Sequence, residues 1–132
     1  MISNIWLNSS ELDISSESLP PRLLEIRNKN AEFTSEYDIF TYGSSKAHDF
    51  INLRFAPDVV WAYEKLNPPS YKADLLKYCI LYTHGGWIID PTLKILSPLP
   101  NIEGIDIFLF FRKDANGNFK IPVPGLIYAK PG

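Results

Sequence analysis

The chain has 132 residues, 45% of them apolar and 14% aromatic, and its formal net charge is −2 at pH 7. This length fits one domain with its own core, and the apolar content excludes a disordered protein. No basic run is present, so the charge offers no case for a nucleic-acid partner. The single cysteine, Cys79, excludes an internal disulfide and is expected to be a small core residue.

No targeting or membrane segment is expected. The first residues lack the basic stretch and apolar run of a signal peptide. No stretch of the sequence approaches the roughly 20 apolar residues that span a bilayer. We therefore expect a cytoplasmic protein without a transmembrane segment, which leaves a peripheral contact with the membrane open.

Apolar periodicity and turn residues predict strands that alternate with helices. Proline suits the first turn of a helix, so helices are expected to begin near Pro21 and Pro57, and Ser70 is expected to cap another. In chain order we expect a strand at 2–7, a polar loop at 8–18, a helix at 20–30, a strand at 37–42, helices at 44–55, 57–66 and 70–84, strands at 87–89 and 105–112, a turn at 114–118, and strands at 119–123 and 126–129. This alternation predicts an α/β domain in which helices cover both faces of a mainly parallel sheet.

Residues 70–84 are predicted to form a helix that is apolar nearly all the way round, as expected inside a protein. Asp74 and Lys77 are the only charges in the body of that helix, and their i, i+3 spacing places them on one face. A charged pair on such a helix needs a polar partner, a bound ligand or a water-filled cleft. Tyr78 and the nearby Trp87 are expected to be core residues.

A short strand follows this helix and ends on a carboxylate. Gly85 and Gly86 fit a left-handed helix stop followed by a close approach of the backbone. Residues 87–89 are apolar and bring Asp90 to the C-terminal end of the strand. In open α/β sheets that end is where ligands bind. Another interpretation is that Asp90 only begins a turn before Pro91.

Two blocks of this region carry a resemblance to a known family: Ala73-Asp-Leu-Leu-Lys-Tyr78 and Gly85-Gly-Trp-Ile-Ile-Asp-Pro-Thr92. They resemble the glycosyltransferases with a DXD sugar-binding region, whose pattern runs Ser/Ala-Asp-Leu-Leu-Arg-Tyr and then Gly-Gly-(Ile/Val)-(Tyr/Trp)-Leu-Asp-x-Asp. Members include fungal initiating mannosyltransferases, bacterial capsular polysaccharide synthesis proteins and glucosylating bacterial toxins. Weaker similarities at residues 5–7, 36–42 and 124–132 extend the resemblance over nearly the whole chain.

The resemblance implies a GT-A-like, Rossmann-like fold whose mainly parallel sheet is flanked by helices. It also implies the transfer of a sugar, with retention, from a nucleotide-sugar donor (a UDP- or GDP-sugar) to a glycan or polysaccharide acceptor, as in capsular polysaccharide synthesis. The sequence names neither the base nor the sugar nor the acceptor, because these depend on loops that diverge quickly.

Family members continue beyond the position of Gly132 through acceptor-binding elements. Residues 1–132 are therefore expected to form one truncated nucleotide-sugar-binding domain that is incomplete at its C-terminus. The alternative is a non-catalytic sugar-nucleotide-binding remnant, or a fragment that lacks the acceptor half.

Asp90 matches the first carboxylate of the DXD pair, so the resemblance makes it the catalytic residue and a ligand of both the donor and a divalent cation. Thr92 occupies the place of the second carboxylate and is expected to bind the donor and the cation too. A threonine hydroxyl is neutral and a weaker ligand than a carboxylate. We therefore expect Mn²⁺ or Mg²⁺ to bind weakly and to depend on the diphosphate of the donor.

Three more residues match donor-binding positions of the family. Asp74 and Lys77 match the positions that hold ribose and sugar hydroxyls, although lysine lacks the bidentate fork of the usual arginine. Trp6 matches the aromatic residue near the nucleobase. Each also has a purely structural interpretation: a helix-capping carboxylate with an i, i+3 ion pair for the two helix residues, and core packing for Trp6.

Overall fold

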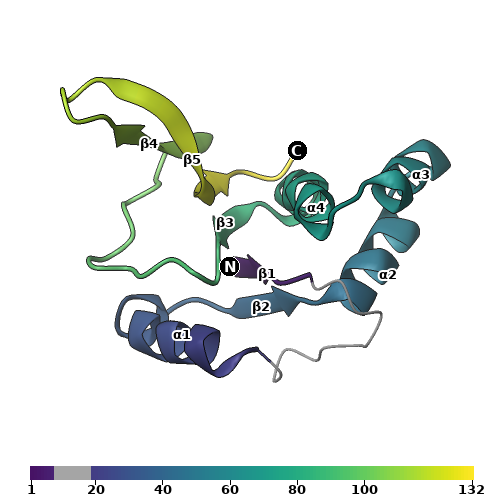
Figure 1. Cartoon of the computed structure of the whole chain (residues 1–132), viewed down its shortest axis with the longest axis horizontal. Coiled ribbons are helices and arrows are strands. Elements are labelled where there is room, and N and C mark those ends of the chain that lie inside the picture. Colours follow the sequence, from purple (N-terminus) through teal and green to yellow (C-terminus); the bar gives the residue numbers. More distant parts are fainter. Residues whose placement is uncertain (8–18) are drawn as a thin grey trace.

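The computed structural model describes residues 1–7 and 19–132, and for residues 119–124 it describes the backbone alone. The polar loop predicted at residues 8–18 lies outside the described residues. The described chain folds into one five-stranded sheet with helices packed on it (Figure 1). None of the described helices is long and apolar enough to cross a membrane.

The sheet has the strand order β2-β1-β3-β5-β4 (Figure 1). Its strands are β1 (Ile2–Ile5), β2 (Ile39–Tyr42), β3 (Gly86–Ile89), β4 (Ile107–Lys113) and β5 (Phe119–Ala129). β1 pairs in parallel with both β2 and β3, whereas β5 is antiparallel to both β3 and β4. Within the described sheet β5 alone runs against the other strands, so the predicted α/β fold with a mainly parallel sheet is confirmed.

Two strands predicted separately, at residues 119–123 and 126–129, form the single strand β5. The predicted turn before it is confirmed, because Asp114 N donates to Asn118 O at 2.9 Å. β5 contains Pro122 and Pro124, which lack an N–H for the ladder. The pairing of β4 with β5 shifts register after Leu109, and such irregularities are where a strand tolerates proline.

The predicted helices are confirmed, with differences at their ends. They are α1 (Pro21–Thr34) between β1 and β2, and α2 (Ser44–Arg54), α3 (Pro57–Lys65) and α4 (Pro69–His84) between β2 and β3. The prediction that Ser70 caps α4 is wrong, because that helix begins at Pro69 and has no side-chain cap hydrogen bond. Proline has a helical φ and no N–H to satisfy, which suits it to the first helical position.

The two faces of the sheet carry separate cores, because alternate residues of a strand point to opposite faces. Ile88 of β3 packs with α2, α3 and α4, whereas its neighbours Trp87 and Ile89 pack on the other face with Ile2 and Tyr128. The helices supply most of the first core through Ala47, Phe50, Ile51, Tyr63, Leu76, Cys79, Ile80 and Leu81. The predicted burial of Trp87 and of the lone cysteine is confirmed.

α4 is buried on one face only. Its buried residues are Leu76, Cys79, Ile80 and Leu81. On the outer face Tyr78 and Tyr82 are 63% and 66% exposed. The predictions that this helix is buried nearly all the way round and that Tyr78 is a core residue are therefore wrong. α4 packs on β1, β3 and β5 from one side, and a tyrosine hydroxyl can hydrogen-bond to water on the other.

The turn from α4 into β3 requires two glycines. Gly85 has a φ of +63° and Gly86 a φ of +89°, in the region that L side chains rarely adopt. A Cβ on Gly85 would lie 2.6 Å from Pro131 Cδ, and a Cβ on Gly86 would lie 2.7 Å from Met1 O. This close approach lets Trp87 N donate to Met1 O at 3.0 Å, which sets β3 beside β1. The predicted helix stop at these glycines and the close backbone approach are thus confirmed. The left-handed form of the stop is not, because Gly85 has a ψ of −158° and lies outside the left-handed helical region.

Candidate functional site

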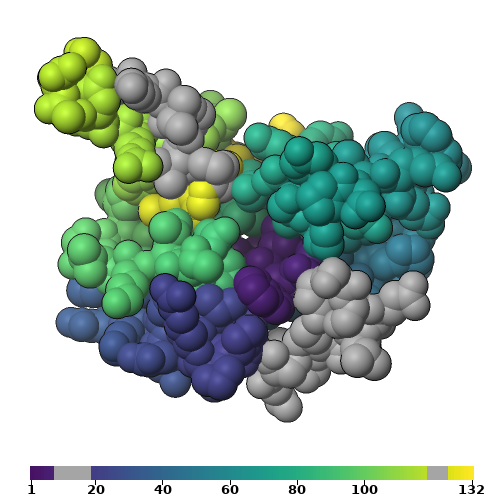
Figure 2. All heavy atoms as spheres, in the orientation of Figure 1, coloured from purple at the N-terminus to yellow at the C-terminus, as the bar shows by residue number. Residues whose placement is uncertain are grey.

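A cleft of about 280 Å³ lies at the edge of the sheet where β1 and β3 end. Its walls come from the residues after β1, the first turns of α4 and the end of β3. The lining residues are Ile5, Trp6, Leu7, Pro69, Ser70, Ala73, Asp74, Lys77, Ile88, Ile89, Asp90 and Gly125. Figure 2 shows the first residues of the chain (purple) at the surface between α4 (teal) and the segment that follows β3 (green). Four of the five predicted site residues therefore line one cleft, and Thr92 is the exception.

One face of α4 forms a wall of the cleft. Ser70, Ala73, Asp74 and Lys77 have the i, i+3, i+4 and i+7 spacing that places them on one side of a helix. The small side chains of Ser70 and Ala73 leave the space that the two charged residues border. This is the polar face that the sequence predicted.

The predicted ion pair on this wall is present, because Lys77 Nζ lies 3.3 Å from Asp74 Oδ1. The capping part of the structural interpretation is not borne out, since the first turn of α4 contains no acidic residue. An ion pair with an exposed member adds little to stability. The pair therefore does not explain by itself why these charges stand on an apolar helix.

Trp6 has two sets of neighbours. It lines the cleft directly after β1. It also packs, partly buried, against the apolar cluster of Leu19, Leu23 and Ile26. The core-packing interpretation of Trp6 is therefore confirmed in part, because the residue packs on this cluster and also lines the cleft.

Asp90 stands at the C-terminal end of β3, as predicted, and its backbone is held on both sides. Asp90 N donates to Gly125 O at 2.7 Å, and Leu93 N donates to Asp90 O at 3.0 Å. The Asp90 side chain is exposed. Its Oδ1 accepts hydrogen bonds from Thr92 N at 2.9 Å and from Thr92 Oγ1 at 2.6 Å. Asp90 therefore both begins a turn and faces the cleft.

Thr92 does not line the cleft. It borders a separate surface depression of about 360 Å³ with residues of α1, Arg22, Glu25 and Lys29 among them. Its contact with the candidate site is made through Asp90.

Gly125 is a cleft residue that was not singled out from the sequence. A Cβ at this position would lie 3.2 Å from Asp90 Cβ and 3.0 Å from Leu93 Cδ1. Any side chain there would press on Asp90, so the glycine keeps β5 close to the end of β3. The only signal in the sequence was the family-like segment at residues 124–132.

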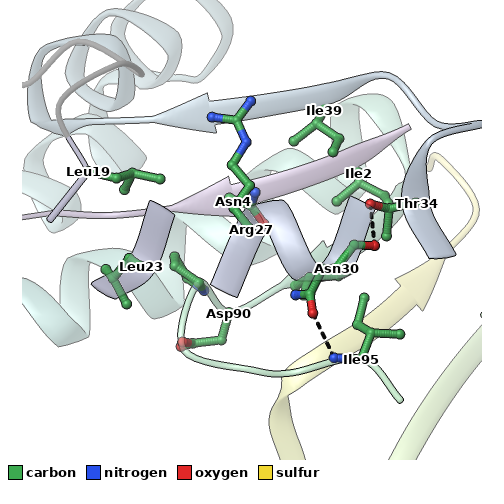
Figure 3. A pocket seen from close by; sticks show the side chains of 12 residues that line it. Ile2, Asn4, Leu19, Leu23, Arg27, Asn30, Thr34, Ile39, Asp90 and Ile95 are labelled. Atoms are coloured by element: carbon green, nitrogen blue, oxygen red, sulfur yellow. Dashed lines mark hydrogen bonds between the residues drawn. The ribbon is translucent and has the colours of Figure 1, made fainter. Parts of the chain in front are cut away.

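Asn30 is a second residue that the sequence did not reveal. It lies in α1 beside a small pocket of about 20 Å³ that Asp90 also lines (Figure 3). Its Nδ2 donates to Leu93 O and its Oδ1 accepts from Ile95 N, both at 2.8 Å. The cavity is at most the size of a water site. Asn30 therefore ties the segment after Asp90 to α1.

The described residues of the cleft offer few ligands to a metal ion. The described residues contain no group of three or more His, Cys, Asp or Glu side chains that could hold a metal ion. Asp90 Oδ1 already accepts two hydrogen bonds from Thr92, while Oδ2 accepts none within the described part of the chain. Mn²⁺ and Mg²⁺ need about six oxygen ligands, so the others would have to come from water and from a bound diphosphate.

An uncharacterized glycosyltransferase of Acanthamoeba polyphaga mimivirus is similar to this chain, with 24% identity over 131 residues. The aligned part is 99% of this chain and 49% of the viral protein. The chain thus spans about half the length of the relative that it matches. No protein-family model matches the chain, and no solved structure matches it significantly.

Proposed function

We propose that this chain is the donor-binding part of a glycosyltransferase that transfers a sugar from a UDP- or GDP-sugar to a glycan or polysaccharide. The observation that carries the proposal is the cleft, which brings Trp6 after β1 together with Asp74 and Lys77 of α4 and Asp90 after β3. It lies at the edge of an α/β sheet where such folds bind nucleotides. The similarity to the viral glycosyltransferase supports glycosyl transfer as the general class.

The cleft residues suit the chemistry of this reaction. Negative charge builds on the diphosphate as the sugar departs, and a cation placed beside it lowers the barrier. The ammonium of Lys77 lies in the cleft wall and can supply part of that charge. Asp74 and Asp90 can accept hydrogen bonds from ribose and sugar hydroxyls, and Trp6 offers a ring to the nucleobase.

A divalent cation belongs to the proposal in a limited role. Asp90 Oδ2 would hold it together with oxygens of the donor diphosphate, and it would add Lewis-acid stabilisation of the leaving group. Retention of the anomeric configuration and a polysaccharide acceptor are further parts of the proposal, supported by the resemblance of the two sequence blocks to the DXD glycosyltransferases.

A second candidate function is sugar-nucleotide binding without turnover. One observation favours it: Asp90 has no second carboxylate within two residues. Turnover separates the two functions. A protein that binds a nucleotide sugar but never releases the sugar to water or to an acceptor would be a binding module.

The direct test is a thermal-shift panel of nucleoside diphosphates and nucleotide sugars, with and without Mn²⁺. A ligand that binds the folded state at 100 times its Kd stabilises it by about 2.7 kcal/mol. We expect the nucleotides of one base to stabilise the wild type and the Asp49→Ala control. The same nucleotides should not stabilise Asp74→Ala or Asp90→Asn. Asp49 is a suitable control because it is an exposed aspartate of α2 outside the cleft. The absence of a shift with every nucleotide would refute the proposal.

A further inference from the structure

Thr92 holds the carboxylate of Asp90 by two hydrogen bonds to the same oxygen. Thr92 N donates to Asp90 Oδ1 at 2.9 Å, and Thr92 Oγ1 donates to it at 2.6 Å. A hydroxyl has one proton, so Thr92 uses its whole donor capacity on Asp90. Hydrogen bonds to an ionised acceptor are the short and strong ones.

The position of Thr92 argues against direct contact with a ligand in the cleft. Thr92 is not among the cleft-lining residues, whereas Asp90 is. Thr92 instead borders the depression beside α1. Its contact with the cleft is made through Asp90 Oδ1, so we expect its effect on a ligand there to pass through the Asp90 carboxylate.

The backbone around Thr92 is fixed from two directions, which makes this arrangement rigid. Before it, Asp90 N donates to Gly125 O of β5. After it, the Asn30 side chain binds both Leu93 O and Ile95 N. An exposed aspartate would otherwise sample several rotamers, at an entropic cost whenever a ligand required one of them.

We propose that Thr92 is a positioning residue that fixes the Asp90 rotamer and leaves Oδ2 as the one carboxylate oxygen offered to the ligand in the cleft. This inference rests on the proposed function. It assigns Thr92 a role different from the cation ligand expected from its place in the DXD-like segment. Asp90 then binds through a single oxygen, and Thr92 lowers the ordering cost of that contact.

The test compares Thr92→Val, which removes the hydroxyl at nearly constant shape, with Thr92→Ser, which keeps it. The first measurement needs no ligand: the Hα–Hβ couplings of Asp90 in the NMR spectrum report its χ1 rotamer. We expect one dominant rotamer in the wild type and in Thr92→Ser, and rotamer-averaged couplings in Thr92→Val.

The second measurement is the Kd of the nucleoside diphosphate that the wild type binds best, by calorimetry with Mn²⁺. Loss of a hydrogen bond to a charged group should weaken binding roughly tenfold in Thr92→Val, since the backbone bond remains. Binding by Thr92→Ser should stay within about threefold of the wild type. A residue that ligated the cation directly would weaken binding when removed but leave the Asp90 rotamer unchanged.

Unchanged couplings in Thr92→Val would overturn the inference, whatever the effect on binding. Averaged couplings in Thr92→Ser would overturn it too, because the hydroxyl would then not be the cause. If the wild type binds no nucleotide, the proposed function fails, and the couplings still decide whether Thr92 fixes Asp90. Thr92 is exposed, so these variants are expected to fold.

Discussion

Lys77 and Asp74 form an ion pair of 3.3 Å in which the cation is nearly buried and the anion is not: their side chains are 13% and 61% exposed. Lys77 thus lines the cleft with little contact with bulk water, while its partner remains in water. Water screens the attraction from Asp74, so much of the positive charge of Lys77 stays available to an anion in the cleft.

Replacing Asp74 separates binding from stability. Asp74 caps no helix end and its own side chain is 61% exposed, so Asp74→Ala should lower the free energy of unfolding by less than about 1 kcal/mol. The same change should abolish stabilisation by nucleotide sugars. Urea unfolding and the thermal-shift panel measure the two effects, with Asp49→Ala as the control. A large stability loss with binding intact would favour the structural interpretation.

Lys77→Met should leave stability nearly unchanged, because methionine fills the volume of the lysine stem and the remaining Asp74 side chain is exposed to water. Binding of a nucleoside diphosphate should weaken about 10- to 100-fold, as expected when a charged hydrogen-bond donor is lost. Lys77→Arg is the matched control and should retain binding, since it keeps the charge and adds the fork. Calorimetry measures all three proteins. Equal affinities of the wild type and Lys77→Met for the diphosphate would show that Lys77 does not contribute to binding.

The turn that leads into β3 should be intolerant of any side chain. Gly85 has φ +63° and ψ −158°, a conformation almost confined to glycine, and a Cβ there would meet Pro131 at 2.6 Å. Gly85→Ala should therefore cost about 3 kcal/mol or more of unfolding free energy. Gly104→Ala is the control, because Gly104 also has a positive φ but has nothing within 4 Å of its added Cβ. It should cost about 1 kcal/mol. Equal losses would show that backbone strain alone matters at Gly85.

The lone cysteine should report on opening of the core. Burial raises the pKa of the Cys79 thiol, and the thiolate is the form that reacts with disulfide reagents. At neutral pH we expect very slow modification of the native protein and fast modification in urea. The core variant Leu76→Ala, next to Cys79 in the same cluster, should accelerate the reaction because it destabilises the packing. Fast modification of the native wild type would contradict the buried assignment.

Local patterns were enough to predict where three charged residues of the cleft lie. Helical spacing put Asp74 and Lys77 on one face, and an apolar strand after two glycines put Asp90 at its end. These predictions succeeded because each depends only on residues that are close in the sequence.

Predictions failed where long-range packing decides. Tyr78 looks like a core residue within its own helix, and only the one-sided packing of α4 on the sheet exposes it. Asn30 looks like a polar helix end, although it continues the spacing of Leu23 and Ile26 and bonds to a loop more than 60 positions away. Such a buried amide has no local signal beyond that spacing.

The altered DXD segment yields the sharpest test of cation binding. Asp90 supplies one charged ligand, and its Oδ1 is engaged by Thr92. The free wild type should therefore bind Mn²⁺ too weakly to detect, and binding should become measurable when UDP or GDP adds phosphate oxygens. Thr92→Asp removes the hydroxyl that binds Asp90 Oδ1 and places a second carboxylate beside it. The two carboxylates repel each other unless a cation lies between them, so Mn²⁺ binding should strengthen even though Thr92 itself is not a ligand. Thr92→Asn is the uncharged control of the same shape and should not.

Calorimetric titration of Mn²⁺ into each variant, with and without the diphosphate, measures this coupling. Asp90→Asn should remove it, because that change deletes the remaining charge at constant size. Coupling that survives in Asp90→Asn would place the cation elsewhere. If Mn²⁺ binding is undetectable in both the wild type and Thr92→Asp, even with the nucleotide present, the cation assignment is wrong. The cleft would then be better explained as a nucleotide-binding module in which Lys77 alone faces the diphosphate.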